Sequence, residues 1–205
     1  AVEAFPQATH FYMLSGDCMP IKSAEYAHAF LDAEDCDYIE NFDFFESDWI
    51  KTGFKEERLI YRHWFNERTR PKWFYASYEL QKRFKITRQV PADIQVMIGS
   101  QWWCLTRQTL LAILQDPRRP EYDQYFNRVW IPDESYFQTL ARLHSNRIES
   151  RSLTLSKFDD QGKPYIFYND HCQMLEESRC FVARKIWPNA TTLYAHFPRP
   201  AQGAP

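Results

Sequence analysis

Residues 94–115 read I-Q-V-M-I-G-S-Q-W-W-C-L-T-R-Q-T-L-L-A-I-L-Q. The first part, 94–103, is an apolar run that Gly99 interrupts, which is typical of a buried strand that ends in a loop. Residues 106–115 space their apolar side chains as a helix does, and the pattern stops before Pro117. A strand followed so closely by a helix predicts an α/β fold.

The same alternation of strand and helix continues on both sides of this stretch. Ser23 is a suitable N-cap for one of the helices, and we expect Asp133 to cap another. The remaining elements that we expect are strands at 10–15, 38–42 and 152–158, and helices at 23–32, 73–85, 133–141 and from 169 onward. This order predicts a mixed sheet flanked by helices, with ligands bound where strands end in polar loops.

Composition sets broad limits on function. The chain has 205 residues, 44% of them apolar and 25% charged, which is typical of a soluble globular domain. A net charge of −2 gives no overall field that would attract nucleic acid or an anionic membrane. No apolar run approaches the length of a spanning helix. The five cysteines form no C-x-x-C pair, which favours reduced thiols and a cytosolic setting.

Charge is unevenly distributed along the chain. Residues 31–48 carry eight acidic residues and no Lys or Arg, whereas residues 55–88 carry ten basic residues and four acidic ones. Two solvated faces of opposite sign would explain this pattern. A cleft would explain it too, with carboxylates that bind hydroxyls and cations that bind phosphate. RNA binding along 55–88 is a third hypothesis, which the net acidity and the lack of a nucleic-acid motif argue against.

Several motifs occur in a fixed order along nearly the whole chain. They are F-Y-M-L-S-G-D-C-M-P-I (11–21), Y-I-E-N (38–41), K-E-E-R (55–58), M-I-G-S-Q-W-W-C-L-T-R (97–107), W-I-P-D-E-S-Y-F-Q-T-L (130–140) and F-V-A-R-K-I (181–186). Together they resemble the Core-2/I-branching glycosyltransferases, which are related to the peptide xylosyltransferases, and this version looks bacterial.

The resemblance implies an activity and a domain organisation. It implies a GT-A-like fold and an inverting, metal-independent transfer from a UDP-sugar to a carbohydrate hydroxyl. The first expected donor sugar is N-acetylglucosamine and the second is xylose. We expect residues 1–197 to be the C-terminal part of one glycosyltransferase domain whose first nucleotide-binding strands are missing, and residues 198–205 to be a Pro-rich tail.

Inversion requires one base on the acceptor side, which removes a proton from the attacking hydroxyl. Glu134 in P-D-E-S matches the base of the family that the chain resembles. Pro132 and Asp133 would place it in the first turn of a helix, where the macrodipole favours the ionised carboxylate. On spacing alone, a capping pair is the better interpretation of Asp133 and Glu134, and only the resemblance of P-D-E-S to the family favours a base.

The leaving diphosphate needs positive charge. The resemblance assigns this role to Lys185, with Arg184 beside it and Lys163 near the place of a second cation. Asp35-Cys36-Asp37 has the spacing of a D-x-D metal motif but lies inside the acidic run. The six histidines show no ligand spacing such as H-x-x-x-H. We therefore expect neither a metal nor a cofactor.

The acceptor needs polar groups and an aromatic surface. Glu40, Lys55 and Arg58 match the acceptor-contacting set of the family, although a surface helix with internal ion pairs would also explain K-E-E-R. Either Trp102 or Trp103 could stack on a sugar ring, and both could equally lie in the core.

The end of the first strand departs from the family pattern. The family usually reads S-G-x-D-[YF]-P there, and Cys18 stands at the position of its Asp. Asp17, one place earlier, is the candidate for contact with the donor sugar. The one-residue shift can re-aim the side chain.

The expected partners are a UDP-sugar donor and a glycan acceptor, with no nucleic acid. The expected location is the cytoplasm, with peripheral contact at a membrane as an option. A different class of function also fits, namely a non-catalytic carbohydrate-binding module or an inactive fragment that keeps only the acceptor groove.

Overall fold

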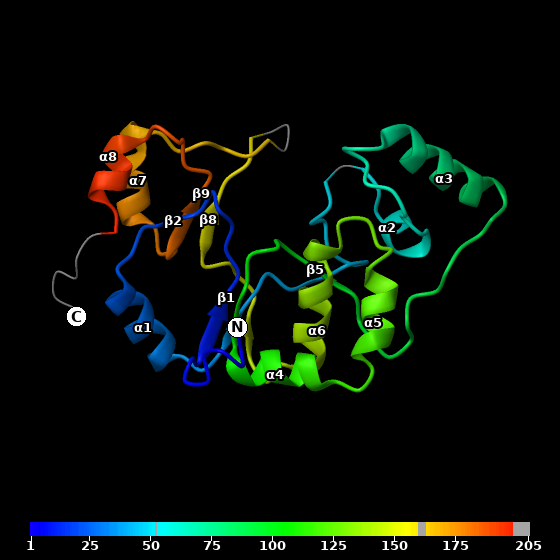
Figure 1. Cartoon of the computed structure of the whole chain (residues 1–205), viewed down its shortest axis with the longest axis horizontal. Helices are drawn as coiled ribbons and strands as arrows, with labels where there is room; N and C mark the ends of the chain where they lie inside the picture. Colours follow the sequence, from blue (N-terminus) through cyan, green and yellow to red (C-terminus); the bar gives the residue numbers. More distant parts are fainter. Residues whose placement is uncertain (52, 160–162, 199–205) are drawn as a thin grey trace. The chain divides into compact units, whose positions relative to one another are not determined.

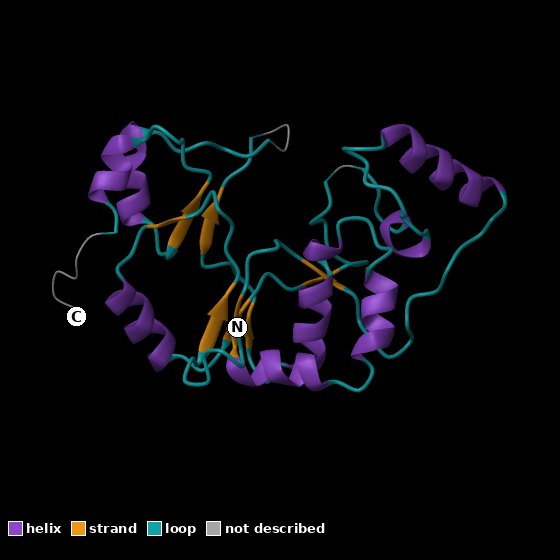
Figure 2. Cartoon of the chain, in the orientation of Figure 1, coloured by secondary structure: helices purple, strands orange, loops and turns teal. Residues whose placement is uncertain are grey.

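The computed structural model describes residues 1–51, 53–159 and 163–198 of the chain. Contacts divide these residues into two compact units, each of which is described by itself. Unit 1 contains residues 1–39, residues 102–107 and the described residues from 149 onward, and unit 2 contains the described residues of 40–101 and 108–148. Both units combine short strands with helices (Figure 2).

Unit 1 is built on two small sheets. In the first, of order β1-β6-β3-β7, strands β1 and β3 both run antiparallel to β6. In the second, of order β2-β9-β8, β9 runs antiparallel to β2 and parallel to β8. The strands are β1 His10–Tyr12, β2 Met19–Pro20, β3 Asp37–Tyr38, β6 Cys104–Thr106, β7 Ile148–Glu149, β8 Thr154–Ser156 and β9 Val182–Arg184.

Helices cover these sheets and bury their apolar residues. Ser23 caps the first helix, because its hydroxyl accepts a hydrogen bond from the Tyr26 N–H at 3.2 Å. One apolar cluster packs β2 and β9 against the last helices through side chains such as Leu175 and Leu193. The helical elements are α1 Ala24–Ala33, η2 Asn169–His171, α7 Cys172–Glu177 and α8 Thr191–His196 (Figure 1).

Unit 2 has more helix and a single two-stranded sheet, in which β4 and β5 are antiparallel. Helix α6 packs against β5, where the Thr139 hydroxyl accepts a hydrogen bond from the Met97 N–H. The elements are α2 Glu57–Ile60, α3 Pro71–Arg83, α4 Arg107–Gln115, α5 Arg119–Phe126, η1 Pro132–Glu134, α6 Tyr136–His144, β4 Phe42–Asp43 and β5 Met97–Ile98. The first residue of α4 is counted in unit 1, and the first residue of β7 in unit 2.

The predicted α/β class and the flanking helices are confirmed, but the single mixed sheet is replaced by three small ones. The strand predicted at 38–42 is wrong, because β3 and β4 belong to different sheets and Glu40 lies between them. The helix predicted at 133–141 is present as α6, but Asp133 does not cap it. Residues 132–134 form a short 3-10 turn, and α6 begins only after Ser135.

Two predictions about the whole chain can be compared with the described residues. No disulfide is formed among the cysteines of the described residues. In the described part of the chain, no helix combines the length and the apolar character needed to cross a bilayer. Residues 199–205 of the predicted Pro-rich tail lie outside the described residues.

Candidate active site

Gly99 brings three segments of unit 2 together. A Cβ atom at this position would lie 2.1 Å from the backbone oxygen of Glu40, so only glycine allows the two backbones to approach so closely. The Gly99 N–H donates to the carbonyl of Glu134 at 2.9 Å, and the Ser100 N–H donates to the carboxylate of Glu40 at 2.8 Å. The backbone at Gly99 and Ser100, directly after β5, therefore connects the predicted base Glu134 to the predicted acceptor residue Glu40.

Arg58 and Glu134 form an ion pair inside this unit. The Arg58 Nη1 lies 2.8 Å from the Glu134 Oε2, and the two side chains are 8% and 25% exposed. The guanidinium also donates from Nε to the Phe54 carbonyl at 2.8 Å and stacks over the Trp130 ring at 4.8 Å. Arg58 is thus held from three sides, and one oxygen of Glu134 is fixed by it.

The second oxygen of Glu134 is available for chemistry. No hydrogen bond or ion pair from the described residues reaches Oε1. Burial raises the pKa of Glu134, while the hydrogen bond and positive charge of Arg58 oppose that rise. A carboxylate with a raised pKa and one open oxygen can accept a proton from a bound hydroxyl.

Three buried polar atoms lie on the residues around this carboxylate. Ser100 Oγ, Ser135 Oγ and Gln138 Oε1 have no hydrogen-bond partner in the described structure. The Gln138 amide nitrogen donates to the Ser100 carbonyl at 2.7 Å, so the two residues belong to one network. Buried polar atoms normally have partners, and such a cluster is therefore a candidate for contact with a ligand or with water.

Sequence reasoning did not find Gln138, Ser135 or Trp130. The sequence contains a signal for Gln138, which is a polar residue four positions after Glu134 and within the apolar pattern of α6. Ile131 gives another signal in the structure. Its φ of 55° is left-handed, which is strained for a β-branched residue and is often found at functional sites.

The expected reason for the ionisation of Glu134 is corrected by the structure. Glu134 ends the 3-10 turn η1, and Ser135 is the residue that precedes α6. A three-residue turn has little macrodipole of its own, and the pKa of Glu134 is raised by burial. The positive charge of Arg58, which is close by, therefore favours the ionised form more than the helix start does.

The other predicted acceptor residues are distributed over both units. Lys55 in unit 2 is exposed, and its ammonium has no partner among the described residues. Trp102 and Trp103 belong to unit 1, and both are buried. The prediction that one of them stacks on a sugar is not tested by this burial, but neither ring presents an exposed face.

The predicted donor-side residues lie in unit 1. The Lys185 ammonium is 3.3 Å from the Asp17 carboxylate, and both side chains are partly exposed. The Arg184 guanidinium stacks over Trp102 at 4.3 Å, and its buried Nε has no partner in the described structure. Lys163 is exposed, and its backbone N–H donates to the Asp159 carboxylate at 2.7 Å. Of the predicted set, Asp17 and Lys185 are thus brought into direct contact.

Two further sequence features have local explanations. Cys18, at the position of the family Asp, accepts a hydrogen bond from the Ser15 N–H at 3.4 Å and so closes the turn before β2. Asp37 of the D-x-D pattern is buried, and its carboxylate accepts from the Thr106 N–H at 2.6 Å. Asp35 is exposed. Asp37 therefore acts in the sheet that joins β3 to β6.

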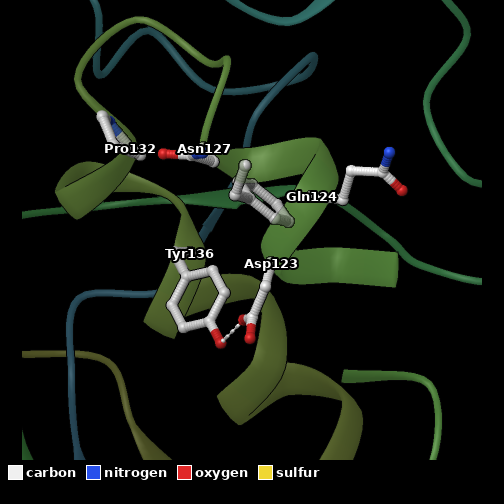
Figure 3. Close-up of a pocket in the computed structure, with 6 residues that line it drawn as sticks. Asp123, Gln124, Asn127, Pro132 and Tyr136 are labelled. Atoms are coloured by element: carbon white, nitrogen blue, oxygen red, sulfur yellow. Dashed lines mark hydrogen bonds between the residues drawn. The ribbon is translucent and has the colours of Figure 1, made fainter. Parts of the chain in front are cut away.

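A shallow pocket of about 400 Å³ lies beside the turn that carries Glu134 (Figure 3). Tyr136 and Asp123 form a hydrogen bond of 2.5 Å across it, and Pro132 forms part of its wall. Glu134 itself does not line the pocket. The pocket is therefore next to the candidate base but is not the place where that base would act.

Comparison with known proteins gives a family assignment. No curated protein matches the chain. The family model for Core-2/I-branching enzymes matches residues 1–179, which include Asp17, Arg58 and Glu134, whereas Lys185 lies beyond the matched range. The chain therefore belongs to the Core-2/I-branching enzyme family, and this membership indicates a glycosyltransferase activity.

Proposed function

We propose that this chain is an inverting glycosyltransferase in which Glu134 is the catalytic base. The donor would be a UDP-sugar, with N-acetylglucosamine favoured over xylose, and the acceptor would be a carbohydrate hydroxyl. The fold would be GT-A-like. The observation that carries the proposal is the carboxylate of Glu134, whose Oε2 is held by Arg58 at 2.8 Å and whose pKa is raised by burial.

This arrangement suits the base of an inverting displacement. In the proposed step, Oε1 of Glu134 takes the proton of the acceptor hydroxyl while that oxygen bonds to the anomeric carbon. The bond from the anomeric carbon to the nucleotide oxygen breaks, and the UDP leaves with the electron pair. The raised pKa makes Glu134 a stronger base than an ordinary carboxylate, and Arg58 keeps it oriented.

Acceptor hydroxyls would be bound by polar groups of the same unit. Glu40 lies next to Ser100, and the orphan atoms of Ser100, Ser135 and Gln138 could exchange hydrogen bonds with hydroxyls. Lys55 and Arg58 complete the proposed acceptor set. Trp102 and Trp103 belong to unit 1, and stacking of one of them on a sugar ring stays a separate proposal.

On the donor side, we assign the diphosphate to Lys185, with Arg184 and Lys163 as weaker candidates, and the donor sugar to Asp17. The ion pair of Lys185 with Asp17 supports a shared role. Fixed cations can stabilise the developing phosphate charge without a metal, so the transfer itself is proposed to be metal-independent. A cytoplasmic location is part of the proposal and is supported by the cysteine spacing, which contains no C-x-x-C pair.

Substitution of Glu134 by Gln tests the role of the base. Gln keeps the size of the side chain and can still accept a hydrogen bond from Arg58, but it cannot take a proton at neutral pH. We expect transfer to a panel of acceptor sugars to fall by roughly 10²- to 10⁴-fold, which is the usual contribution of a general base. Circular dichroism should show that the fold is kept.

The matched control is Asp133→Asn, which removes the neighbouring exposed carboxylate. The charge of Asp133 is the smallest contribution to the raised pKa of Glu134, so this variant should keep most of the transfer activity. Transfer by Glu134→Gln at the rate of the unchanged chain would refute the role of the base. If the unchanged chain neither transfers sugar nor binds UDP in calorimetry, the catalytic proposal fails for this chain. A non-catalytic carbohydrate-binding module would then be the better interpretation.

A further inference from the structure

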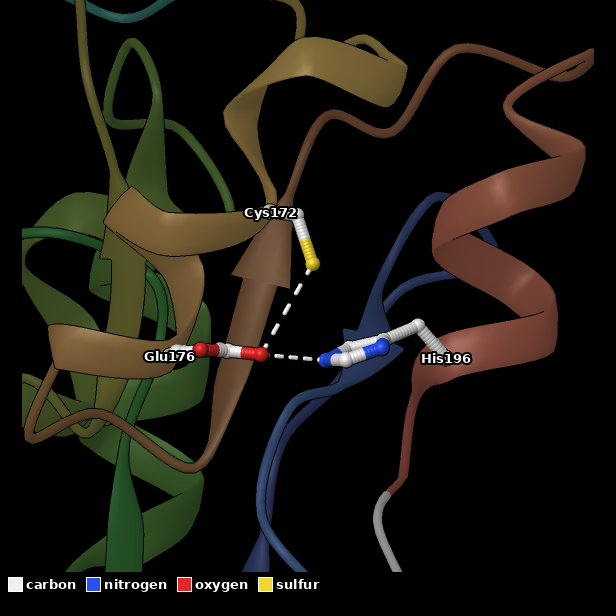
Figure 4. A group of neighbouring side chains, drawn as sticks. All are labelled: Cys172, Glu176 and His196. Atoms are coloured by element: carbon white, nitrogen blue, oxygen red, sulfur yellow. Dashed lines mark hydrogen bonds and ion pairs between the residues drawn. The ribbon is translucent and has the colours of Figure 1, made fainter.

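Three side chains with different metal-binding atoms meet between α7 and α8, the last two helices of unit 1 (Figure 4). Cys172 and Glu176 lie one turn apart on the same face of α7, and His196 is the last residue of α8. The Cys172 Sγ lies 3.8 Å from the Glu176 Oε1, which also contacts the Nε2 of His196. All three ligand atoms are within 4.8 Å of one another.

The two helices that carry these residues rest on one apolar cluster. Leu175 of α7 and Leu193 of α8 are both fully buried in it, and Cys172 packs against its edge. Asn169 accepts hydrogen bonds from the N–H groups at the start of α8, and Lys22 donates to the Glu176 carbonyl at 2.8 Å. The ligand atoms are therefore brought together by packing that does not depend on their own contacts.

The mixture of donor atoms selects the class of metal. A thiolate, an imidazole nitrogen and a carboxylate oxygen form a borderline-soft set that suits Zn²⁺, whereas Mg²⁺ and Ca²⁺ prefer oxygen alone. Tetrahedral zinc with ordinary bond lengths separates its ligand atoms by about 3.3 to 3.7 Å. Small side-chain rotations would bring the three atoms to those separations, with zinc replacing the contact between Glu176 and His196.

We propose that Cys172, Glu176 and His196 bind one zinc ion, with a water molecule as the fourth ligand. The ion would connect α7 to α8 and so stabilise the C-terminal helices of unit 1. This inference does not depend on the proposed transfer reaction, whose base lies in unit 2. Glu176 and His196 can also interact without a metal, and the experiment must separate these two cases.

Titration of the metal-free full chain with Co²⁺ separates them. Cobalt bound to a thiolate gives a sulfur-to-metal charge-transfer band in the near ultraviolet and strong visible bands when four-coordinate. We expect both at one equivalent of Co²⁺, and we expect Zn²⁺ to abolish them. Cys172→Ser and His196→Ala should lose the charge-transfer band and weaken zinc binding by more than about tenfold.

Cys180→Ser is the matched control, because Cys180 is a free, partly buried thiol that packs against the same apolar cluster but is not part of the group. It should bind cobalt as the unchanged chain does. Thermal melting without metal should show whether each variant folds. Absence of the charge-transfer band in the unchanged chain, or its equal loss in Cys180→Ser, would overturn the proposal and leave a hydrogen-bonded Glu–His pair.

Discussion

Replacement of Arg58 by Gln would remove the positive charge that lies 2.8 Å from the Glu134 carboxylate. Burial raises the pKa of this carboxyl, and Arg58 is the main group that opposes the rise. Without Arg58, burial would act unopposed, and the pKa of Glu134 should rise further.

The size of this rise follows from the geometry of the pair. An opposite charge in contact with a carboxylate lowers its pKa by roughly one to three units, which corresponds to about 1.4 to 4 kcal/mol. Arg58 is only 8% exposed, which favours a strong effect, whereas the 25% exposure of Glu134 lets water moderate it. We therefore expect the variant to raise the pKa of Glu134 further, by the effect of one partly buried contact ion pair.

The measurement is a pH titration of the Glu side-chain carboxyl signals by NMR in the full chain labelled with ¹³C-glutamate. The Glu134 signal is identified by its absence in Glu134→Gln. The matched control is Arg88→Gln. Like Arg58, Arg88 donates from its Nε to a carbonyl and stacks over an aromatic ring, here Tyr125. Its Nη1 donates to a second carbonyl, and no carboxylate in the described residues pairs with it.

The variant also has a defined effect on stability. Because the pKa of Glu134 is higher in the folded chain than in the unfolded chain, its contribution to stability is fully present below the unfolded pKa and is lost as the pH rises through the folded pKa. Removal of Arg58 extends this loss to higher pH. The free energy of unfolding of Arg58→Gln should therefore fall further below that of the unchanged chain as the pH rises from about 4.5 to 8.

Two outcomes would contradict the interpretation of the pair. One is a change of less than about half a unit in the pKa of Glu134, because a contact ion pair should have at least twice that effect. The other is a loss in the free energy of unfolding of Arg58→Gln that is the same at pH 4.5 as at pH 8. The contacts that Arg58 loses would then not depend on the ionisation of Glu134. A comparable pKa change in Arg88→Gln would show that the effect is not specific to the pair.

Two further predictions concern the stability of the fold, one in each unit. Gly99→Ala should lower the free energy of unfolding by about 3 kcal/mol, at the upper end for overpacking, because its Cβ would meet the Glu40 backbone. The control is Gly16→Ala, whose Cβ meets nothing within 4 Å and which should change the free energy of unfolding by less than about 0.5 kcal/mol. Equal urea midpoints for the two variants would disprove the close approach at Gly99. Ser23→Ala should cost about 1 kcal/mol by removing the cap of α1, whereas Ser23→Asp should keep the urea midpoint of the unchanged chain.

Elements with local signals could be predicted from the sequence. Ser23 begins α1 as a capping hydroxyl, and the pattern before Pro117 gave the end of α4 at Gln115. Gly99 interrupts the strand as expected. The failure at 38–42 has a physical cause, because a short apolar run does not reveal with which strand each residue pairs. β3 pairs with β6 and β4 with β5, and these partners lie about 55 to 65 residues away in the sequence.

The candidate site required long-range contacts that spacing cannot reveal. Arg58 and Glu134 were both found through the family motifs, but their contact joins residues 76 positions apart. The group of Cys172, Glu176 and His196 was missed for the same reason. The one-turn spacing of the first two is visible in the sequence, whereas His196 comes from the next helix, so a search for paired histidines cannot detect it.

The structure leaves Glu134 as the proposed base but changes the physical explanation of its ionisation. A base at the start of a helix would owe its ionisation to the macrodipole, and its pKa would be lowered. The structure instead combines burial, which raises the pKa, with one fixed cation, which limits the rise. This combination suits catalysis better, because a base with a low pKa is ionised but weak, and an unopposed buried carboxyl is strong but protonated. Arg58 therefore sets the compromise between the two, and a substitution at Arg58 should change the pH dependence of transfer even if the acceptor still binds.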